Sequence, residues 1–217
     1  MQDLKTLVQY AQQHPEKVYF TSDTHFGHTN IIKLCNRPFL DVKEMNEKLI
    51  ENWNKTVEKD AIVFHLGDFC FGSTTLWKNV RSRLNGYLVL IKGNHDEHNL
   101  KPSLESIFDA VIYQVYFRMP DNITVYLNHY PFLCYGGSYK TEHNVWQLFG
   151  HVHSGPNNTG LDNDRLCHCF PTQYDVGVDN NDYAPVSWNK IKEIISNRIA
   201  NGSINRISRT SSSKNYY

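Results

Sequence analysis

The feature that most constrains the fold of this chain is a recurring pair, a short apolar run followed by a polar segment. Five runs rich in β-branched, leucine and aromatic residues span residues 18–20, 62–66, 88–91, 124–127 and 145–149. Such runs are typical of buried strands. Each leads within a few residues to a polar side chain, in order Asp23, Asp68, Asn94, His129 and His151. Functional groups of α/β folds gather at the carboxyl ends of strands, where loops can converge. We therefore expect these five segments to build one site.

Helical patterns separate the early strands. Helices are expected over residues 2–13, 43–57, 74–84 and 187–200. Strands that alternate with helices indicate an α/β fold. Residues 110–127 form consecutive strand patterns around Pro120-Asp121-Asn122, which predicts a hairpin, and a further strand is expected near residues 174–178.

The length limits the number of domains. A chain of 217 residues can bury one good core and is too short for two full domains. We expect a single domain over residues 1–202. The remaining residues, 203–217, are rich in Ser, Asn and Arg with little to bury, so a disordered tail is expected there.

Charge and hydropathy narrow the choice of partners. The chain has 22 basic and 22 acidic residues, a net charge of +0, so no global field attracts nucleic acid or an acidic membrane. No apolar stretch approaches the length of a membrane span, and Met1 to His14 lacks the apolar region of a signal peptide. We expect a cytoplasmic protein that acts on a small molecule, with nucleic acid an unfavoured partner.

The spacing of the polar residues suits metal binding. In Asp23-Thr24-His25 and His151-Val152-His153 two ligand types stand two residues apart. At a strand end this spacing puts both side chains on one face, so each pair can aim at one point. Glycines directly precede Asp68, Asn94 and His151, and we expect them to permit sharp backbone turns.

The donor set indicates the kind of ion. Two carboxylates, one amide oxygen and about four imidazoles suit divalent Mn, Fe, Ni, Co or Zn. The set is too rich in nitrogen for a dedicated calcium or magnesium site. It is also too large for one tetrahedral ion, whereas two ions that share a bridging carboxylate fit the count.

The ordered series D-x-H, G-D, G-N-H-D, H and G-H-x-H from Asp23 to His153 resembles the calcineurin-like metallophosphoesterase superfamily. Residues Phe20 to Asn30, with the later Asn36-Arg37-Pro38-Phe39, resemble a branch of small bacterial and phage phosphoesterases. The resemblance implies a four-layer α/β/β/α sandwich of two mixed β-sheets flanked by helices. It also implies a metal-dependent hydrolase of phosphomonoesters or phosphodiesters.

The resemblance assigns a role to each matching position. One ion would be held by Asp23, His25 and His153, the other by Asn94, His129 and His151, with Asp68 bridging the two. Manganese is the ion we expect, and Fe, Ni, Co and Zn also suit the set. A hydroxide that bridges the ions would attack phosphorus. His95, oriented by Asp96, would protonate the leaving oxygen.

Two further residues are candidates for gripping phosphate oxygens. Arg37 can bind an oxyanion bidentately, although a solvated arginine is the default for a loop. His28 lies outside the core pattern and is equally compatible with a capping role. A catalytically silent metal-bound interaction module and a nuclease are the alternative functions. The complete ligand set argues against the first, and the neutral charge against the second. The expected substrate is a small, nucleotide-like phosphoester; its identity and the oligomeric state stay open.

Overall fold

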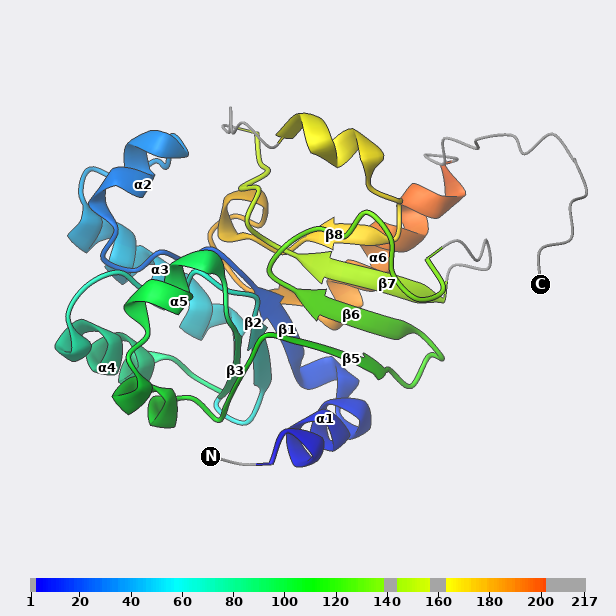
Figure 1. Ribbon diagram of the computed structural model, residues 1–217, viewed down its shortest axis with the longest axis horizontal. Helices are drawn as coiled ribbons and strands as arrows, with labels where there is room; N and C mark the ends of the chain where they lie inside the picture. The colour runs from blue at the N-terminus through cyan, green and yellow to red at the C-terminus, as the bar shows by residue number, and fades with distance from the viewer. Residues whose placement is uncertain (1–2, 139–143, 157–162, 202–217) are drawn as a thin grey trace, which may run out of the picture.

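The computed structural model describes residues 3–138, 144–156 and 163–201 and shows two β-sheets packed face to face (Figure 1). The first sheet has five strands in the order β4-β3-β2-β1-β9, all parallel except β9. The second has four strands in the order β5-β6-β7-β8, with β5 antiparallel to β6 and the rest parallel. The strand bounds are β1 Val18–Thr21, β2 Ile62–His65, β3 Tyr87–Ile91, β4 Ala110–Ile112, β5 Gln114–Arg118, β6 Thr124–Asn128, β7 Val145–Phe149, β8 Gln173–Asp175 and β9 Val186–Ser187.

Six α-helices and four short 3-10 helices are present in the described residues. The α-helices are α1 Leu4–Gln13, α2 Thr29–Leu34, α3 Val42–Thr56, α4 Thr74–Arg83, α5 Asn94–Asn99 and α6 Trp188–Ala200. The 3-10 helices are η1 Pro15–Lys17, η2 Pro102–Ile107, η3 Asn163–His168 and η4 Val178–Asn180. None of the helices in this part of the chain is long and apolar enough to cross a membrane.

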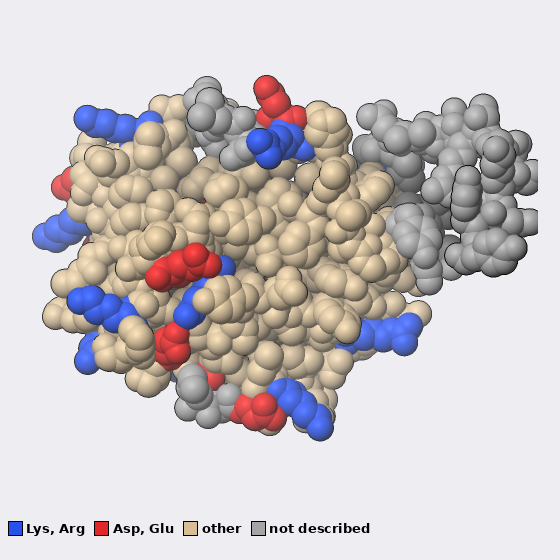
Figure 2. Space-filling view, viewed as in Figure 1, with Lys and Arg blue, Asp and Glu red and all other residues tan. Residues whose placement is uncertain are grey.

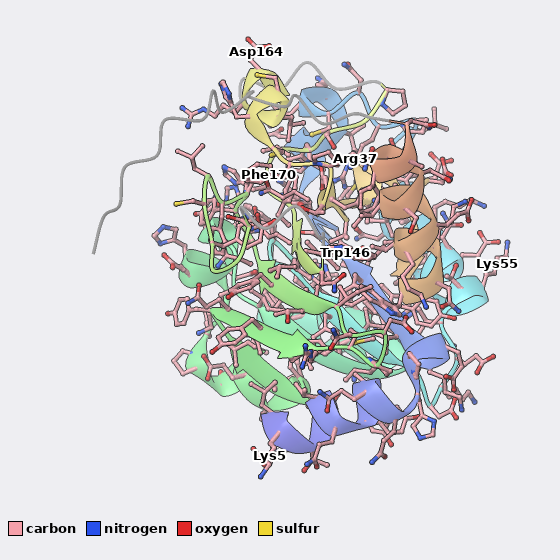
Figure 3. The ribbon with its side chains drawn as sticks, turned by 90° about the vertical axis from the view of Figure 1, so that its right-hand side faces the viewer. Lys5, Arg37, Lys55, Trp146, Asp164 and Phe170 are labelled. Atoms are coloured by element: carbon pink, nitrogen blue, oxygen red, sulfur yellow. The ribbon has the colours of Figure 1, made fainter. Side chains whose placement is uncertain are left out.

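Aromatic side chains fill the space between the two sheets. Phe64 in β2 lies 5.6 Å from Phe20 in β1 and 5.3 Å from Phe117 in β5, measured between ring centroids. Trp188, the first residue of α6, lies 5.3 Å from Trp146 in β7, and both are buried. Figure 3 labels Trp146 inside the molecule. Residues of α1 and α6 belong to the same buried cluster, so these helices close the core between the sheets.

The other face of the first sheet is covered by α3 and α4 (Figure 1). Met45, Leu49 and Trp53 recur at helical spacing on the buried side of α3. In α4, Trp77 lies on the buried side. Asp41 and Ser73 cap the two helices, each accepting a hydrogen bond from a backbone amide in the first turn. The first sheet is thereby buried on both faces.

Part of the outer face of the second sheet, around Tyr126 and Gln147, is covered by the segment 130–138. Gln147 in β7 donates to the carbonyl of Tyr130 and accepts from the amide of Phe132, at 2.8 and 2.9 Å. Tyr135 packs on Tyr126 of β6 with 5.3 Å between ring centroids. This segment follows His129 directly and becomes important for the shape of the site.

The prediction of an α/β fold with two mixed sheets flanked by helices is confirmed. The hairpin of β5 and β6 is present, and the strand expected near 174–178 is shorter and ends at Asp175. The short helices α2 and α5 and the strand β9 were not predicted. Each has six residues or fewer, too few to show a period. The tail expected at 203–217 lies outside the described residues.

Trp188 provides a test of the core between the sheets. Replacing it with alanine removes a fully buried indole, and we expect Trp188→Ala to lower the free energy of unfolding by about 3–5 kcal/mol. Leu40→Ala, at a side chain that is 94% exposed, is the control and should change it by less than about 0.5 kcal/mol. Urea denaturation of both variants measures the difference. Similar losses in both would contradict the assignment of Trp188 to the core.

Candidate metal centre

The seven expected ligands come together where the two sheets meet. They lie at the carboxyl ends of five strands, as the sequence predicted. The first sheet supplies Asp23 and His25 after β1, Asp68 after β2 and Asn94 after β3; the second supplies His129 after β6, with His151 and His153 after β7.

Asp23, His25 and His153 form one group of donors. The Oδ1 atom of Asp23 lies 3.7 Å from Nε2 of His153 and 4.0 Å from Nε2 of His25. One donor atom from each of the three residues lies within 4.8 Å of the others. Separations of this size leave room for an ion between the donors.

Asn94, His129 and His151 form the second group. The side-chain oxygen of Asn94 lies 3.0 Å from Nε2 of His129 and 3.1 Å from Nδ1 of His151. The other ring nitrogen of His129 lies 2.7 Å from the carbonyl oxygen of Leu66. An N–H at that nitrogen would donate to the carbonyl and leave Nε2 with its lone pair toward the centre.

Asp68 lies between the two groups. Its Oδ2 atom is 3.6 Å from Nε2 of His25 and also 3.6 Å from Nε2 of His129. Its other oxygen accepts a hydrogen bond of 3.0 Å from the backbone amide of His95. One carboxylate oxygen thus faces both groups, the position that a bridging ligand requires.

Two buried polar atoms at the centre have no hydrogen-bond partner within the described part of the chain. They are Oδ1 of Asp23 and Nε2 of His25, in residues that are almost fully buried. Leaving such atoms unpaired costs free energy, more for a charged group. A divalent cation would satisfy both, and the mixed oxygen and nitrogen donors suit a transition metal. The residues therefore fit the metal site that the sequence indicated.

The backbone at the centre is strained. Five of the seven expected ligands have positive φ angles: Asp23 at 57°, His25 at 51°, Asp68 at 59°, His151 at 69° and His153 at 47°. A left-handed conformation is uncommon in residues other than glycine and clusters at functional sites. Its recurrence at these positions indicates that the fold holds the side chains in an imposed arrangement.

The glycines beside the ligands act mainly through close contacts. Of the three, only Gly67 has a positive φ, at 98°. A Cβ atom on Gly93 would lie 2.3 Å from Oδ1 of Asp68, and one on Gly150 would lie 2.3 Å from Oδ2 of Asp23. At Gly93 and Gly150 glycine is therefore required for the space that a carboxylate occupies rather than for a left-handed backbone.

Burial sets the protonation of the ligands in the metal-free protein. It lowers the pKa of His25 well below its usual value and that of His129 to about 4, so both are neutral at pH 7. Burial, with the nearby charges of Asp23 and Asp96, raises the pKa of Asp68 to about 8. For His153 burial is outweighed by the carboxylates of Asp23 and Asp179, and its pKa is raised.

His95 lies beside the centre with its ring partly exposed. Its Nε2 is 3.9 Å from Oδ2 of Asp68, and its ring centroid is 4.7 Å from that of Phe71. The ring of His28 stacks on that of Phe71, with 4.1 Å between the ring centroids. Its Nδ1 atom lies 3.3 Å from Nδ1 of His25. Both side chains are therefore next to the expected ligands, on the side of His25.

Asp96 has different partners from those expected. Its carboxylate accepts from the backbone amides of Asp68, Phe69 and Gly93 at 2.7, 3.0 and 2.9 Å. These bonds tie the loop after β2 to the start of α5. Within the described residues, all its hydrogen bonds go to backbone amides and none to the ring of His95. Asp96 therefore does not orient that ring by a direct hydrogen bond, as had been expected.

The expected phosphate contact of Arg37 was also wrong, because its guanidinium is buried and all five N–H donors have acceptors. Two bonds of 2.8 Å join Nε and one terminal nitrogen to the carboxylate of Asp179. The others go to the carbonyls of Asp23 and Thr24, at 2.7 and 3.0 Å, and to the sulfur of Met45. Arg37 therefore supports the ligand loop after β1.

Asp179 is the residue that the sequence interpretation missed. Its Oδ2 lies 2.8 Å from Nδ1 of His153, so Arg37, Asp179 and His153 form a chain of contacts that leads to the centre. Asp179 follows the strand pattern at 174–178 directly, and Asp68 likewise follows the apolar run 62–66 after a single glycine. The same arrangement of strand and carboxylate could have identified it.

This chain of contacts predicts the effect of Asp179→Asn. The asparagine side chain lacks the negative charge with which Asp179 orients and polarises the ring of His153. Loss of such a partner typically weakens metal affinity by about 10–100-fold. Isothermal titration calorimetry with manganese measures the dissociation constant of each variant. Asp121→Asn, at an exposed ion pair with Lys192, is the matched control. Equal affinity in both variants would refute the role of Asp179.

The raised pKa values predict how metal-free protein responds to pH. Asp68, with a pKa raised by burial from 3.8 to about 8, and His153, with a pKa raised by Asp23 and Asp179 above 6.5, both hold a proton more tightly when folded. Their stabilising effect is lost as pH rises through these folded values. His25 and His129 are neutral above pH 6.5 whether folded or unfolded, because burial lowers their pKa.

We therefore expect the Tm of chelated protein to fall between pH 6.5 and about 8. Metal-loaded protein should not show this fall, because bound ions keep Asp68 deprotonated throughout. Scanning calorimetry at several pH values, with chelator and with manganese, measures both curves. A Tm of the chelated protein that is constant or increases over this interval would contradict the expectation.

Comparisons with known proteins agree with this geometry. The family model for calcineurin-like phosphoesterases matches residues 16–184. An uncharacterized protein of Methanocaldococcus jannaschii is 36% identical over 82% of this chain and 91% of its own length. The Gene 66 protein of Mycobacterium phage L5 is 30% identical over 63% of this chain and 77% of its own. A solved protein of unknown function from Aquifex aeolicus superposes with a TM-score of 0.61 at 26% identity, covering 82% of this chain and 98% of that one. The chain belongs to the calcineurin-like phosphoesterase family and is thus a metal-dependent phosphoester hydrolase.

Proposed function

We propose that this protein hydrolyses small phosphoesters with a dinuclear metal centre, in which Asp68 would bridge the two ions. The observation that carries the proposal is the position of Oδ2 of Asp68, 3.6 Å from a ring nitrogen in each donor group. Asp23, His25 and His153 would hold one ion, and Asn94, His129 and His151 the other. Manganese is the ion we favour for this set of donors.

The charge of the centre suits phosphate. When bound, two divalent ions supply four positive charges and lower the pKa of water from ~15.7 to about 7. Asp23 and Asp68 are the two carboxylates among the expected ligands and cancel only part of that charge. The backbone amide of His151 donates to Oδ2 of Asp23 at 2.9 Å, which directs the other oxygen of Asp23 toward the centre. The remaining positive charge favours a phosphate dianion or monoanion.

His95 is the group we propose as proton donor to the leaving oxygen. Its ring is 41% exposed at the edge of the centre, so it can reach a substrate that the buried ligands cannot. Its backbone amide is fixed to Oδ1 of Asp68, which keeps the residue beside the bridging position. Asp96 contributes indirectly, since its three bonds to backbone amides hold the loops that carry Asp68 and Asn94.

The first experiment measures metal content and hydrolysis together. Manganese-reconstituted protein should contain nearly two ions per chain and release p-nitrophenol from p-nitrophenyl phosphate, from its bis ester, or from both. Asp68→Asn should lose most of the metal and the activity, whereas Asp121→Asn should keep both. Protein with two ions and no activity on either ester would favour a catalytically silent module.

A second experiment separates the role of His95 from metal binding. We expect His95→Gln to lower kcat by about 10²–10⁴-fold with nearly unchanged metal content, because an acid is lost and no expected ligand is removed. His98→Gln, an exposed histidine in the same helix α5, is the matched control and should keep full activity. Equal kcat values for the two variants would show that His95 is not the proton donor.

A further inference from the structure

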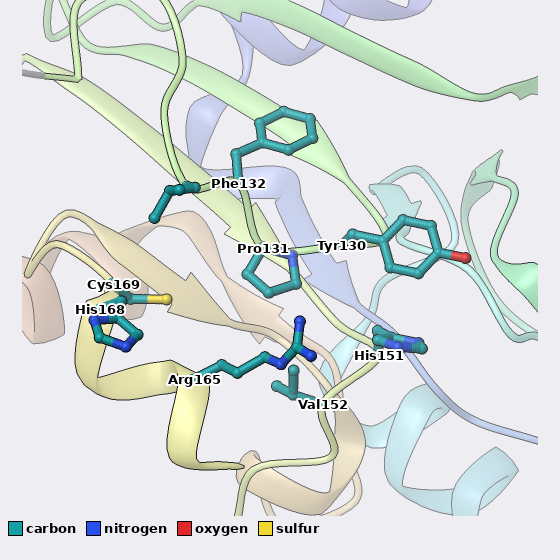
Figure 4. Close-up of a pocket in the computed structure, with 9 residues that line it drawn as sticks. Tyr130, Pro131, Phe132, His151, Val152, Arg165, His168 and Cys169 are labelled. Atoms are coloured by element: carbon teal, nitrogen blue, oxygen red, sulfur yellow. The ribbon is translucent and has the colours of Figure 1, made fainter. Parts of the chain in front are cut away.

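A pocket of about 700 Å³ opens beside the metal centre, with the expected ligand His151 in its lining (Figure 4). We call it the side pocket. It lies between the segment that follows His129 and the 3-10 helix η3. Its lining consists of Tyr130, Pro131, Phe132, Leu133, His151, Val152, Arg165, His168 and Cys169.

The side pocket adjoins the centre at His151, which lines the pocket and is one of the expected ligands. Tyr130 stands edge-on against the rings of His151 and His129, with centroid distances of 4.7 and 4.9 Å. A phosphate at the centre would therefore lie next to the mouth of the pocket. Whatever is attached to the phosphorus on this side would enter it.

One wall of the side pocket is apolar and accessible. Leu133 is 79% exposed and Tyr130 is 43% exposed, and Pro131 and Phe132 stand between them in the chain. A single exposed leucine needs no explanation. Here, however, several apolar and aromatic side chains remain uncovered together in a concavity, which is typical of a ligand site.

The opposite wall carries positive and aromatic groups. Figure 4 shows the side chain of Arg165 extending from η3 toward Val152, with the ring of His168 at the far end of the pocket. A guanidinium can stack on a flat ring and can also bind an oxyanion. Figure 2 shows lysine and arginine scattered over this face of the molecule rather than gathered in one basic surface, so the positive charge of Arg165 at the pocket is local.

We propose that the side pocket binds a nucleoside attached to the phosphorus, so that the substrate of the centre is a nucleotide ester. This inference rests on the proposed function and adds the substrate class. The volume is in the ordinary range for a small ligand, the aromatic and proline rings offer flat surfaces for a base, and the guanidinium of Arg165 offers another on which a base can stack. Because stacking on these rings does not depend on which base is bound, we expect the side pocket to accept different bases.

Binding of two phosphonates to manganese-loaded protein tests the inference. The first is the analogue of adenosine 5′-monophosphate in which CH₂ replaces the ester oxygen, so that it cannot be hydrolysed. The second is ethylphosphonate, with the same head group and no nucleoside. We expect calorimetry to show binding of the nucleoside phosphonate about tenfold tighter or more, as a stacked base would give.

Matched variants locate the preference in the pocket. Leu133→Ser and Arg165→Gln should each reduce the ratio of the two affinities by at least about threefold. Leu40→Ser and Arg118→Gln, at exposed positions of the same residue types away from the pocket, should leave the ratio unchanged. The corresponding dinucleotide phosphonate should bind no more tightly than the mononucleotide if the substrate is a free nucleotide, and more tightly if the substrate is a strand end.

The possible failures are distinct. Equal affinities for the two phosphonates, with both abolished by chelator, would overturn the side pocket as a nucleoside site and leave the proposed phosphoesterase in place. A preference that survives both Leu133→Ser and Arg165→Gln would also overturn it. Absence of binding by either phosphonate to protein that holds two ions would overturn the inference and count against the proposed function as well.

Discussion

Two buried carboxylates, Asp23 and Asp68, are the constraint on which the rest of the site depends. Both are at least 98% buried, and Oδ1 of Asp23 has no hydrogen-bond partner within the described residues. The histidines that face them cannot all act as counterions, because burial lowers the pKa of His25 and His129 and keeps those rings neutral. The fold has therefore gathered carboxylates and imidazole lone pairs around one point, and in the metal-free protein the raised pKa values of Asp68 and His153 keep protons there. Divalent cations would replace those protons, so metal binding and stability should be closely coupled.

That arrangement is maintained by groups that never reach the centre. Asp96 uses both carboxylate oxygens to hold backbone amides of the loops after β2 and β3, and Arg37 holds the carbonyls of the loop after β1. Asp179 connects Arg37 to His153. These contacts offset the left-handed conformations that five of the expected ligands adopt. Charged residues near the centre thus divide into those that would face an ion and those that keep the ligand loops in place, and sequence position alone does not separate the two.

The strand pattern and the ligand motifs predicted both the sheets and the residues that converge, because parallel strands place their carboxyl ends at one edge. Asp68 illustrates this, since a glycine and an aspartate after a buried run suffice to place it. Arg37 illustrates the limit: its loop predicts solvent exposure, but a carboxylate 142 residues later draws it into the interior. Asp96 shows a second limit, because a residue next to His95 in the chain has its partners on another loop. The side pocket could not be predicted, since its second wall comes from η3, a segment without any motif.

The two sheets contribute unequally to chemistry and to recognition. The expected ligands come from both, so the centre exists only when the sheets are packed against each other around Phe64 and Phe117. The side pocket is built instead from the loop after β6, the loop after β7 and η3. Loops tolerate substitution better than strand ends that carry ligands. Changes at Leu133 or Arg165 can therefore alter which group is bound beside the phosphorus while the donors of the centre stay the same. This separation explains physically how one metal centre can serve substrates that share only a phosphoester.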